Sequence, residues 1–144
     1  MIRSVPHPVM FGHDDPGLAE LRSIALALPD AYEKVSHGRP GFFATKMFAS
    51  YGGSSKVTRP PGHVAAEGEM VRYPYSMLVK VDDAERAALA QDARFYYPAY
   101  IGASGWLGLD FTAAEVDWDE VRELVDASFR LVASAKLIAE LDGR

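Results

Sequence analysis

Residues that could bind a metal or transfer protons are sparse in this chain. It has no cysteine and four histidines, at positions 7, 13, 37 and 63. No two histidines stand four residues apart and no H-E-x-x-H sequence occurs, so the spacing predicts no metal site. His37 precedes Gly38-Arg39-Pro40 near several aromatic residues, and a His-Arg pair there can bind an anion. The same residues can instead form a turn, which is the interpretation we favour.

Sequence signatures of nucleophilic catalysis and of phosphate loops are also absent. There is no G-x-S-x-G, no G-x-G-x-x-G and no G-x-x-x-x-G-K-[ST]. Acidic residues cluster at positions 82–85 and 117–120, where segments with helical character begin. Carboxylates at a helix N-terminus are stabilised by the helix dipole, which accounts for both clusters without catalysis. We therefore expect no enzymatic activity, no metal and no cofactor.

Basic residues concentrate in the middle of an acidic chain. The net charge is −5, yet residues 34–80 hold seven basic and two acidic groups. Arg39, Lys46 and Lys80 are interleaved there with aromatic residues, a composition that resembles a surface on which single-stranded nucleic acid stacks. Lysines on strands also prevent strand edges from pairing with other chains, and this plainer explanation is favoured. Most of the aromatic residues are expected in the core.

The chain length of 144 residues predicts a single domain with a core that needs no disulfide. The absence of cysteine fits a reducing compartment, and no apolar run reaches the ~18 residues of a membrane span, so we expect a cytoplasmic protein without membrane contact. Residues 1–13 are expected as an N-terminal arm. Residues 52–74, which are rich in Gly and Pro, are expected as a long loop.

Helices and strands are predicted from the period of the apolar residues. The helices are one that Asp15 and Pro16 begin and Pro29 ends, one over Ala84–Gln91 capped by Asp82, one with Asp117 and Glu120 as a capping box, and a short one over Ala135–Leu141. The strands are Pro40–Ala44, Lys46–Tyr51, Tyr75–Val81 and Trp106–Phe111, with Phe95–Tyr100 as an aromatic segment interrupted by Pro98. This order predicts an α+β fold, an antiparallel sheet of about five strands with helices packed on one face.

Seven segments carry a resemblance to known proteins. They are ALALPD (25–30), HGRPGF (37–42), KMFA (46–49), MLVKVD (77–82), YYPAY (96–100), GWLGL (105–109) and VDWDEVREL (116–124). In this order the set resembles the MmcQ/YjbR-like family of bacterial proteins, over about residues 18–141. The resemblance implies a CyaY-like α+β fold, also described as a double-wing arrangement, and a DNA-binding role. Carried over by position, the phosphate contacts are Arg39, Lys46 and Lys80.

The leading hypothesis is a small binding protein whose partner is nucleic acid, and two alternatives stay open. One is a protein-interaction module with an exposed patch of Tyr96, Tyr97 or Tyr100. The other is a small-ligand site between the long loop and the sheet. The candidate residues of that ligand site are His37, Tyr73, Tyr75 and Trp106.

Overall fold

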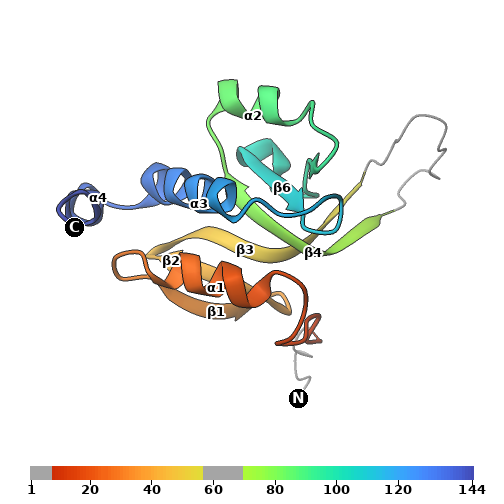
Figure 1. Ribbon diagram of the computed structural model, residues 1–144, viewed down its shortest axis with the longest axis horizontal. Helices are drawn as coiled ribbons and strands as arrows, with labels where there is room; N and C mark the ends of the chain where they lie inside the picture. The colour runs from red at the N-terminus through yellow and green to blue at the C-terminus, as the bar shows by residue number, and fades with distance from the viewer. Residues whose placement is uncertain (1–7, 57–69) are drawn as a thin grey trace, which may run out of the picture.

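The computed structural model describes residues 8–56 and 70–144 (Figure 1). The elements follow in the order α1 (Leu18–Leu26), β1 (Tyr32–Ser36), β2 (Arg39–Ala44), β3 (Lys46–Ser55), β4 (Val71–Lys80), α2 (Asp83–Leu89), β5 (Phe95–Tyr96), the 3-10 helix η1 (Gly102–Ser104), β6 (Trp106–Asp110), α3 (Trp118–Val132) and α4 (Ala135–Asp142). Within the described ranges, no helix combines the length and the apolar character needed to cross a membrane.

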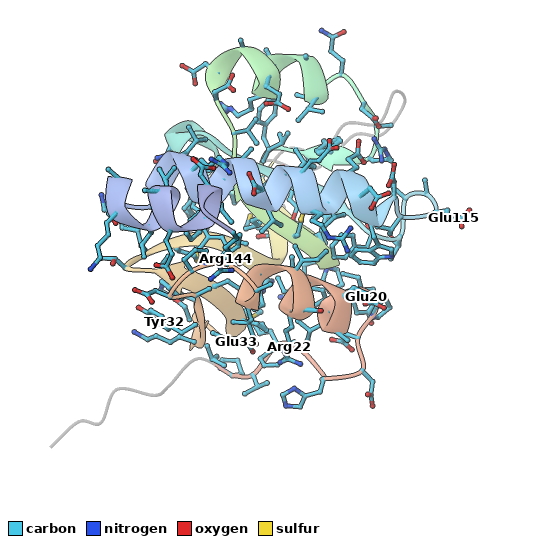
Figure 2. The ribbon with its side chains drawn as sticks, turned by 60° about the vertical axis from the view of Figure 1, so that its left-hand side comes forward. Glu20, Arg22, Tyr32, Glu33, Glu115 and Arg144 are labelled. Carbon is cyan, nitrogen blue, oxygen red and sulfur yellow. The ribbon has the colours of Figure 1, made fainter. Side chains whose placement is uncertain are left out.

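Six strands form one sheet in the order β1-β2-β3-β4-β6-β5, and every neighbouring pair is antiparallel. Helices α1 and α3 lie over the same face of this sheet, in front of the strands in Figure 2. The predicted α+β class is confirmed. The sheet has one strand more than the expected five because residues 32–36, which are not among the predicted strands, pair with β2 along their whole length.

The core lies between the sheet and these two helices. Phe42, Ala49, Val79 and Leu107 stand opposite one another on β2, β3, β4 and β6, and all four are fully buried. Phe129 of α3 meets Phe48 edge to face, with ring centroids 5.3 Å apart. Burying each large apolar side chain contributes about 1.5–3 kcal/mol. The buried residues of α3 belong to the predicted apolar face of the last long helix: Val121, Leu124, Val125, Ser128 and Phe129.

Ser128 joins α3 to the centre of the sheet. Its hydroxyl donates to the carbonyl oxygen of Phe48 in β3 at 2.5 Å and accepts from the N–H of Lys80 in β4 at 2.8 Å. Both backbone groups would otherwise be buried without a partner, which is costly. A side chain predicted as part of an apolar face therefore completes the hydrogen bonding between two strands.

The start of α3 is only partly as predicted. The Asp117 carboxylate caps the helix and accepts from the N–H groups of Asp119 and Glu120 at 3.0 and 3.2 Å. The Glu120 carboxylate does not turn back to form a capping box. It lies 2.7 Å from a guanidinium nitrogen of Arg94, which also pairs with Asp92. A tertiary ion pair has replaced the local hydrogen bond.

The start of α1 differs from the prediction. The helix begins at Leu18, and its N-cap is Gly17 with φ 81° rather than Asp15. The Asp15 carboxylate instead accepts from the N–H of Gly12 at 2.7 Å. A Cβ on Gly17 would lie closer than 3.0 Å to the ring of Phe111, so the chain turns where a glycine lets this aromatic side chain pack.

The two ends of the predicted 52–74 loop are strand. β3 continues to Ser55 and β4 begins at Val71. The Gly52-Gly53 pair, which the sequence indicated as a break, lies inside β3, where the pairing register with β4 shifts between Tyr51 and Gly53. Residues 57–69 of the predicted loop and residues 1–7 of the predicted arm lie outside the described residues.

Candidate anion-binding site

The face of the sheet opposite α1 and α3, called here the open face, has glycine or serine at three of the five positions of its central row. Lys34, Gly41, Ser50, Leu78 and Gly108 stand opposite one another across β1, β2, β3, β4 and β6. This row alternates with the buried row of the core because successive residues of a strand point to opposite faces. Glycine and serine leave room above the backbone, which larger side chains from the neighbouring rows occupy.

Tyr96 of β5 lies in a slot that two glycines leave. A Cβ on Gly108 would lie closer than 3.0 Å to the Tyr96 ring, and a Cβ on Gly53 would lie as close to its hydroxyl. The hydroxyl is 2.7 Å from Ser76 Oγ. Since Ser76 donates its hydrogen to the carbonyl of Tyr73 at 2.8 Å, Tyr96 is the donor to Ser76. Burial raises the pKa of Tyr96, so this hydroxyl stays neutral.

Tyr73 of β4 covers Tyr96 from outside. The two rings are stacked, with centroids 3.9 Å apart and an interplanar angle of 11°. Tyr96 is 8% exposed while Tyr73 is only partly buried, so Tyr73 is the outer ring of the pair. Burial raises the pKa of Tyr73, and the negative charge of Asp110 adds to the rise. The two tyrosines belong to a second hydrophobic cluster, separate from the core. Its other members are Leu78 and Trp106, and Met47 and Ile101 pack against it.

Arg39 of β2 extends across the open face toward this pair of tyrosines. Its Cδ lies 3.3 Å from the position of a Cβ on Gly52, so the missing side chain there gives the arginine its path over β3. The side chain is partly buried, and within the described residues no carboxylate pairs with it. Burial lowers the pKa of Arg39, and the positive charge of Arg72 lowers it further, while the interaction with Tyr96 acts in the opposite direction.

Arg72 is the second cation of the site. It lies in β4 opposite Ser54 of β3, which is two residues beyond Gly52, and its side chain is exposed. In the part of the chain that the structure describes, it also has no carboxylate partner. Five other described arginines pair with acidic side chains, namely Arg22, Arg94, Arg122, Arg130 and Arg144, while Arg86 donates to the carbonyl of Gly102 and lies over the ring of Tyr97. Two adjacent guanidiniums without counter-ions form a site that can bind an anion.

The structure does not bring the three predicted phosphate contacts together. Arg39 and Lys80 share the open face, since Lys80 stands opposite Trp106. By the strand register they lie two strands and four residues apart, which is about 13 Å along the strands and about 10 Å across them. Lys46 is exposed and stands opposite Ala44, whose side chain belongs to the core on the other face.

The four predicted ligand contacts are also separated. Tyr73 and Trp106 belong to the cluster on the open face. Tyr75 packs against the core on the covered face. His37 is exposed in the turn between β1 and β2, where its φ is 52° and its neighbour Gly38 accepts a backbone hydrogen bond from Met10 at 2.8 Å. Of this group, Tyr73 is the residue that stacks on Tyr96.

Sequence reasoning did not identify Arg72 or the slot residues. Tyr96 was expected in an exposed patch, and it is buried because its ring occupies the space above Gly108 and Gly53. The signal available was the presence of glycines inside strands, which marks a close approach of another group. Among the described residues, no three histidine or acidic side chains lie where they could hold a metal ion together.

Comparison with known proteins agrees with this fold. The YjbR family matches residues 26–131, well over half of the chain, and the chain therefore belongs to the YjbR family. The crystal structure of Deinococcus radiodurans protein DR2400, described as a DUF419 domain, is similar over 96% of this chain and 91% of that chain, with a TM-score of 0.57 and 16% sequence identity. That likeness shows the fold alone. No curated protein matches the sequence.

Proposed function

We propose that this YjbR family protein is a non-enzymatic protein that binds nucleic acid through its open face, with Arg39 and Arg72 as the main phosphate contacts. One observation carries the proposal: Arg39 is partly buried beside a second guanidinium and has no carboxylate partner among the described residues. Burying a cation is unfavourable unless an anion compensates it. A phosphate supplies that anion and can accept two parallel hydrogen bonds from a guanidinium.

The charges of the open face support an anionic partner. Lys34 and Lys80 share the face with Arg39, while Asp110 is on the same face across from Ser76. Because the whole chain carries a net charge of −5, the attraction is local and weakens as salt screens it. A cytoplasmic location belongs to the same proposal and is supported by the cysteine-free composition.

A fluorescence-anisotropy titration with labelled DNA at low and at moderate salt tests this function. We expect wild-type protein to bind, and to bind more weakly at the higher salt. Arg39→Glu should abolish binding because it places a carboxylate at the phosphate contact. Lys46→Glu makes the same change of charge away from the open face and should retain wild-type affinity. Binding that is insensitive to salt, or that both variants weaken equally, would contradict the proposal.

A protein partner is the second candidate, and the conformation of Tyr100 favours it. Tyr100 is 79% exposed and has φ 68°, a conformation that costs a non-glycine residue on the order of 1 kcal/mol. The backbone thus holds an aromatic ring in solvent, with Lys56 Nζ 4.5 Å from its centroid. If the partner is a second copy, light scattering should show a mass that rises with concentration, and Tyr100→Ala should prevent the rise. A constant monomer mass would exclude that partner.

A further inference from the structure

Building on the proposed function, we infer that the open-face site receives one phosphorylated nucleoside unit in single-stranded form. Its phosphate lies between the guanidiniums of Arg39 and Arg72, and its base stacks on the outer face of Tyr73. The unit can belong to a single-stranded chain or be a free mononucleotide, because both present the same phosphate and the same unpaired base.

The phosphate half of the site follows from the paths of the two arginines. Arg39 crosses from β2 over Gly52 in β3, and Arg72 stands opposite Ser54, two residues further along β3. Arg72 therefore lies about 7 Å along the strands and one strand, about 5 Å, across from Gly52, a separation that two long arginine side chains can close around one anion. Each guanidinium is a planar fork of donors whose geometry matches phosphate oxygens, whereas a lysine is a single point charge.

The base half of the site is a rigid aromatic surface. Tyr96 cannot sink further because it already rests on Gly108 and Gly53, and its hydroxyl is fixed by Ser76. Tyr73 stacks on it at 3.9 Å, so the outer ring is supported from below before any ligand arrives. A pre-organised surface loses little conformational entropy on binding. An unpaired base has a π-face that stacks on such a ring whatever its sequence.

The restriction to single strands and to one unit follows from what surrounds the two halves. Bases in a duplex are covered on both faces by their neighbours, while single strands can place a base on an aromatic side chain. Among the described residues, Lys80 lies about 13 Å further along the strands, Lys46 is on the other face, and Lys56 lies over the ring of Tyr100, so these lysines do not continue a row from Arg39 and Arg72. In the part of the chain that the structure describes, the cations of the site therefore fit a single phosphate rather than a longer backbone.

The test compares three labelled or competing probes: a short oligothymidylate, a duplex of the same length, and dTMP with thymidine as its phosphate-free counterpart. We expect the oligothymidylate to bind more tightly than the duplex, with a slope of log affinity against log salt between about −0.7 and −1.4, as for one or two neutralised phosphates. Tyr73→Leu should weaken it roughly ten- to hundred-fold, while Tyr73→Phe, which keeps the ring, should bind like wild type. Arg72→Met should weaken binding and make the slope shallower by about 0.7.

The outcomes separate this inference from the proposed function. If the duplex binds as tightly as the single strand and Tyr73→Leu has no effect, while Arg39→Glu still abolishes binding, the inference is overturned and nucleic-acid binding stands. If dTMP binds as tightly as the oligomer and thymidine does not bind, the inference is supported and a free mononucleotide is the source. If inorganic phosphate competes as well as dTMP, the base contact does not exist and the inference fails. If no probe binds, both proposals fail. Thermal unfolding of Tyr73→Leu and Tyr73→Phe shows whether both variants fold.

Discussion

The two faces of the sheet differ in whether their polar groups have partners within the chain. On the covered face, Ser128 bridges the backbone of β3 and β4, and Arg22 of α1 donates to both carboxylate oxygens of Glu33 at 2.8 and 3.0 Å. Figure 2 shows Arg22 and Glu33 pointing toward one another. On the open face, Arg39 has no carboxylate partner among the described residues, and the positive charge of the exposed Arg72 acts on it.

This difference indicates on which face the charged groups find their partners within the folded chain. Pairing a charge inside the chain offsets part of its desolvation cost, and the covered face does this with Arg22 and Glu33. The open face is ordered as tightly in its aromatic part, since Tyr96 fills a slot between glycines. Its cations Arg39 and Arg72, by contrast, have no carboxylate partner among the residues that the structure describes. We interpret the covered face as the source of stability and the open face as the place where a further anion completes the structure.

The largest change in the free energy of unfolding should come from creating a cavity in the core. Phe129 is fully buried and packs on Phe48, so Phe129→Ala should lower the free energy of unfolding by about 3–5 kcal/mol. Tyr32→Ala is the matched change on the open face, where Tyr32 stacks on Phe43 but is 47% exposed. It should cost less than about 1 kcal/mol. Denaturant unfolding measures both, and equal losses would contradict the division of roles between the faces.

Alkaline pH should weaken both faces together. Burial raises the pKa of Tyr51, whose hydroxyl donates to the carbonyl of Pro16 at 2.5 Å on the covered face, and that of Tyr96 on the open face. A raised tyrosine pKa adds stability that is complete below the ordinary value of about 10 and is lost as pH rises above it. The raised pKa of each of these tyrosines should lower the free energy of unfolding by about 1.4 kcal/mol between neutral pH and about pH 11.

Denaturant unfolding at about pH 9 and about pH 11 checks this pH dependence. Tyr96→Phe removes one of these titrating groups and should reduce the loss of unfolding free energy by about 1.4 kcal/mol. A variant that loses as much stability as wild type would show that Tyr96 ionises as easily in the folded chain as in the unfolded one.

The slot of Tyr96 gives the next smaller effect. A Cβ on Gly108 would lie closer than 3.0 Å to the ring, so Gly108→Ala should displace Tyr96 and cost about 1–3 kcal/mol. Gly102→Ala is the control, because its nearest atom would be 3.7 Å from the new Cβ and its stability should change by less than about 0.5 kcal/mol. Thermal unfolding compares the two. If Gly108→Ala melts like wild type, Tyr96 does not depend on the slot.

The covered face was largely predictable from the sequence because its signals are local. The Asp117 cap and the apolar period that follows predict α3, and the alternation of Met77, Val79 and Val81 predicts the core side of β4. Such patterns need only neighbouring residues to be interpreted. The missed details of this face, such as the ion pair of Glu120 with Arg94, depend on a residue from another element.

The open face could not be predicted in the same way. Gly52-Gly53 has the sequence of a turn, and its place inside β3 depends on Arg39 and Tyr96, which lie far from it in the chain. Register shifts on both sides of β3 also decide which side chains share a face. Because of the register shift between β2 and β3, Lys46 and Arg39 lie on opposite faces of the sheet, and the alternation of residues within each strand does not predict this shift.

The smallest expected change in stability is at Arg39 itself, and it tests the comparison most directly. Arg39→Met keeps a long apolar side chain over Gly52 and removes an unpaired charge, so the free energy of unfolding should stay unchanged or rise by up to about 1 kcal/mol. The matched variant Arg22→Met leaves Glu33 without its partner and should cost about 1 kcal/mol. Denaturant unfolding without added ligand measures both. If Arg39→Met destabilises the protein as much as Arg22→Met does, Arg39 supports the fold, and the open face is then no different from the covered one.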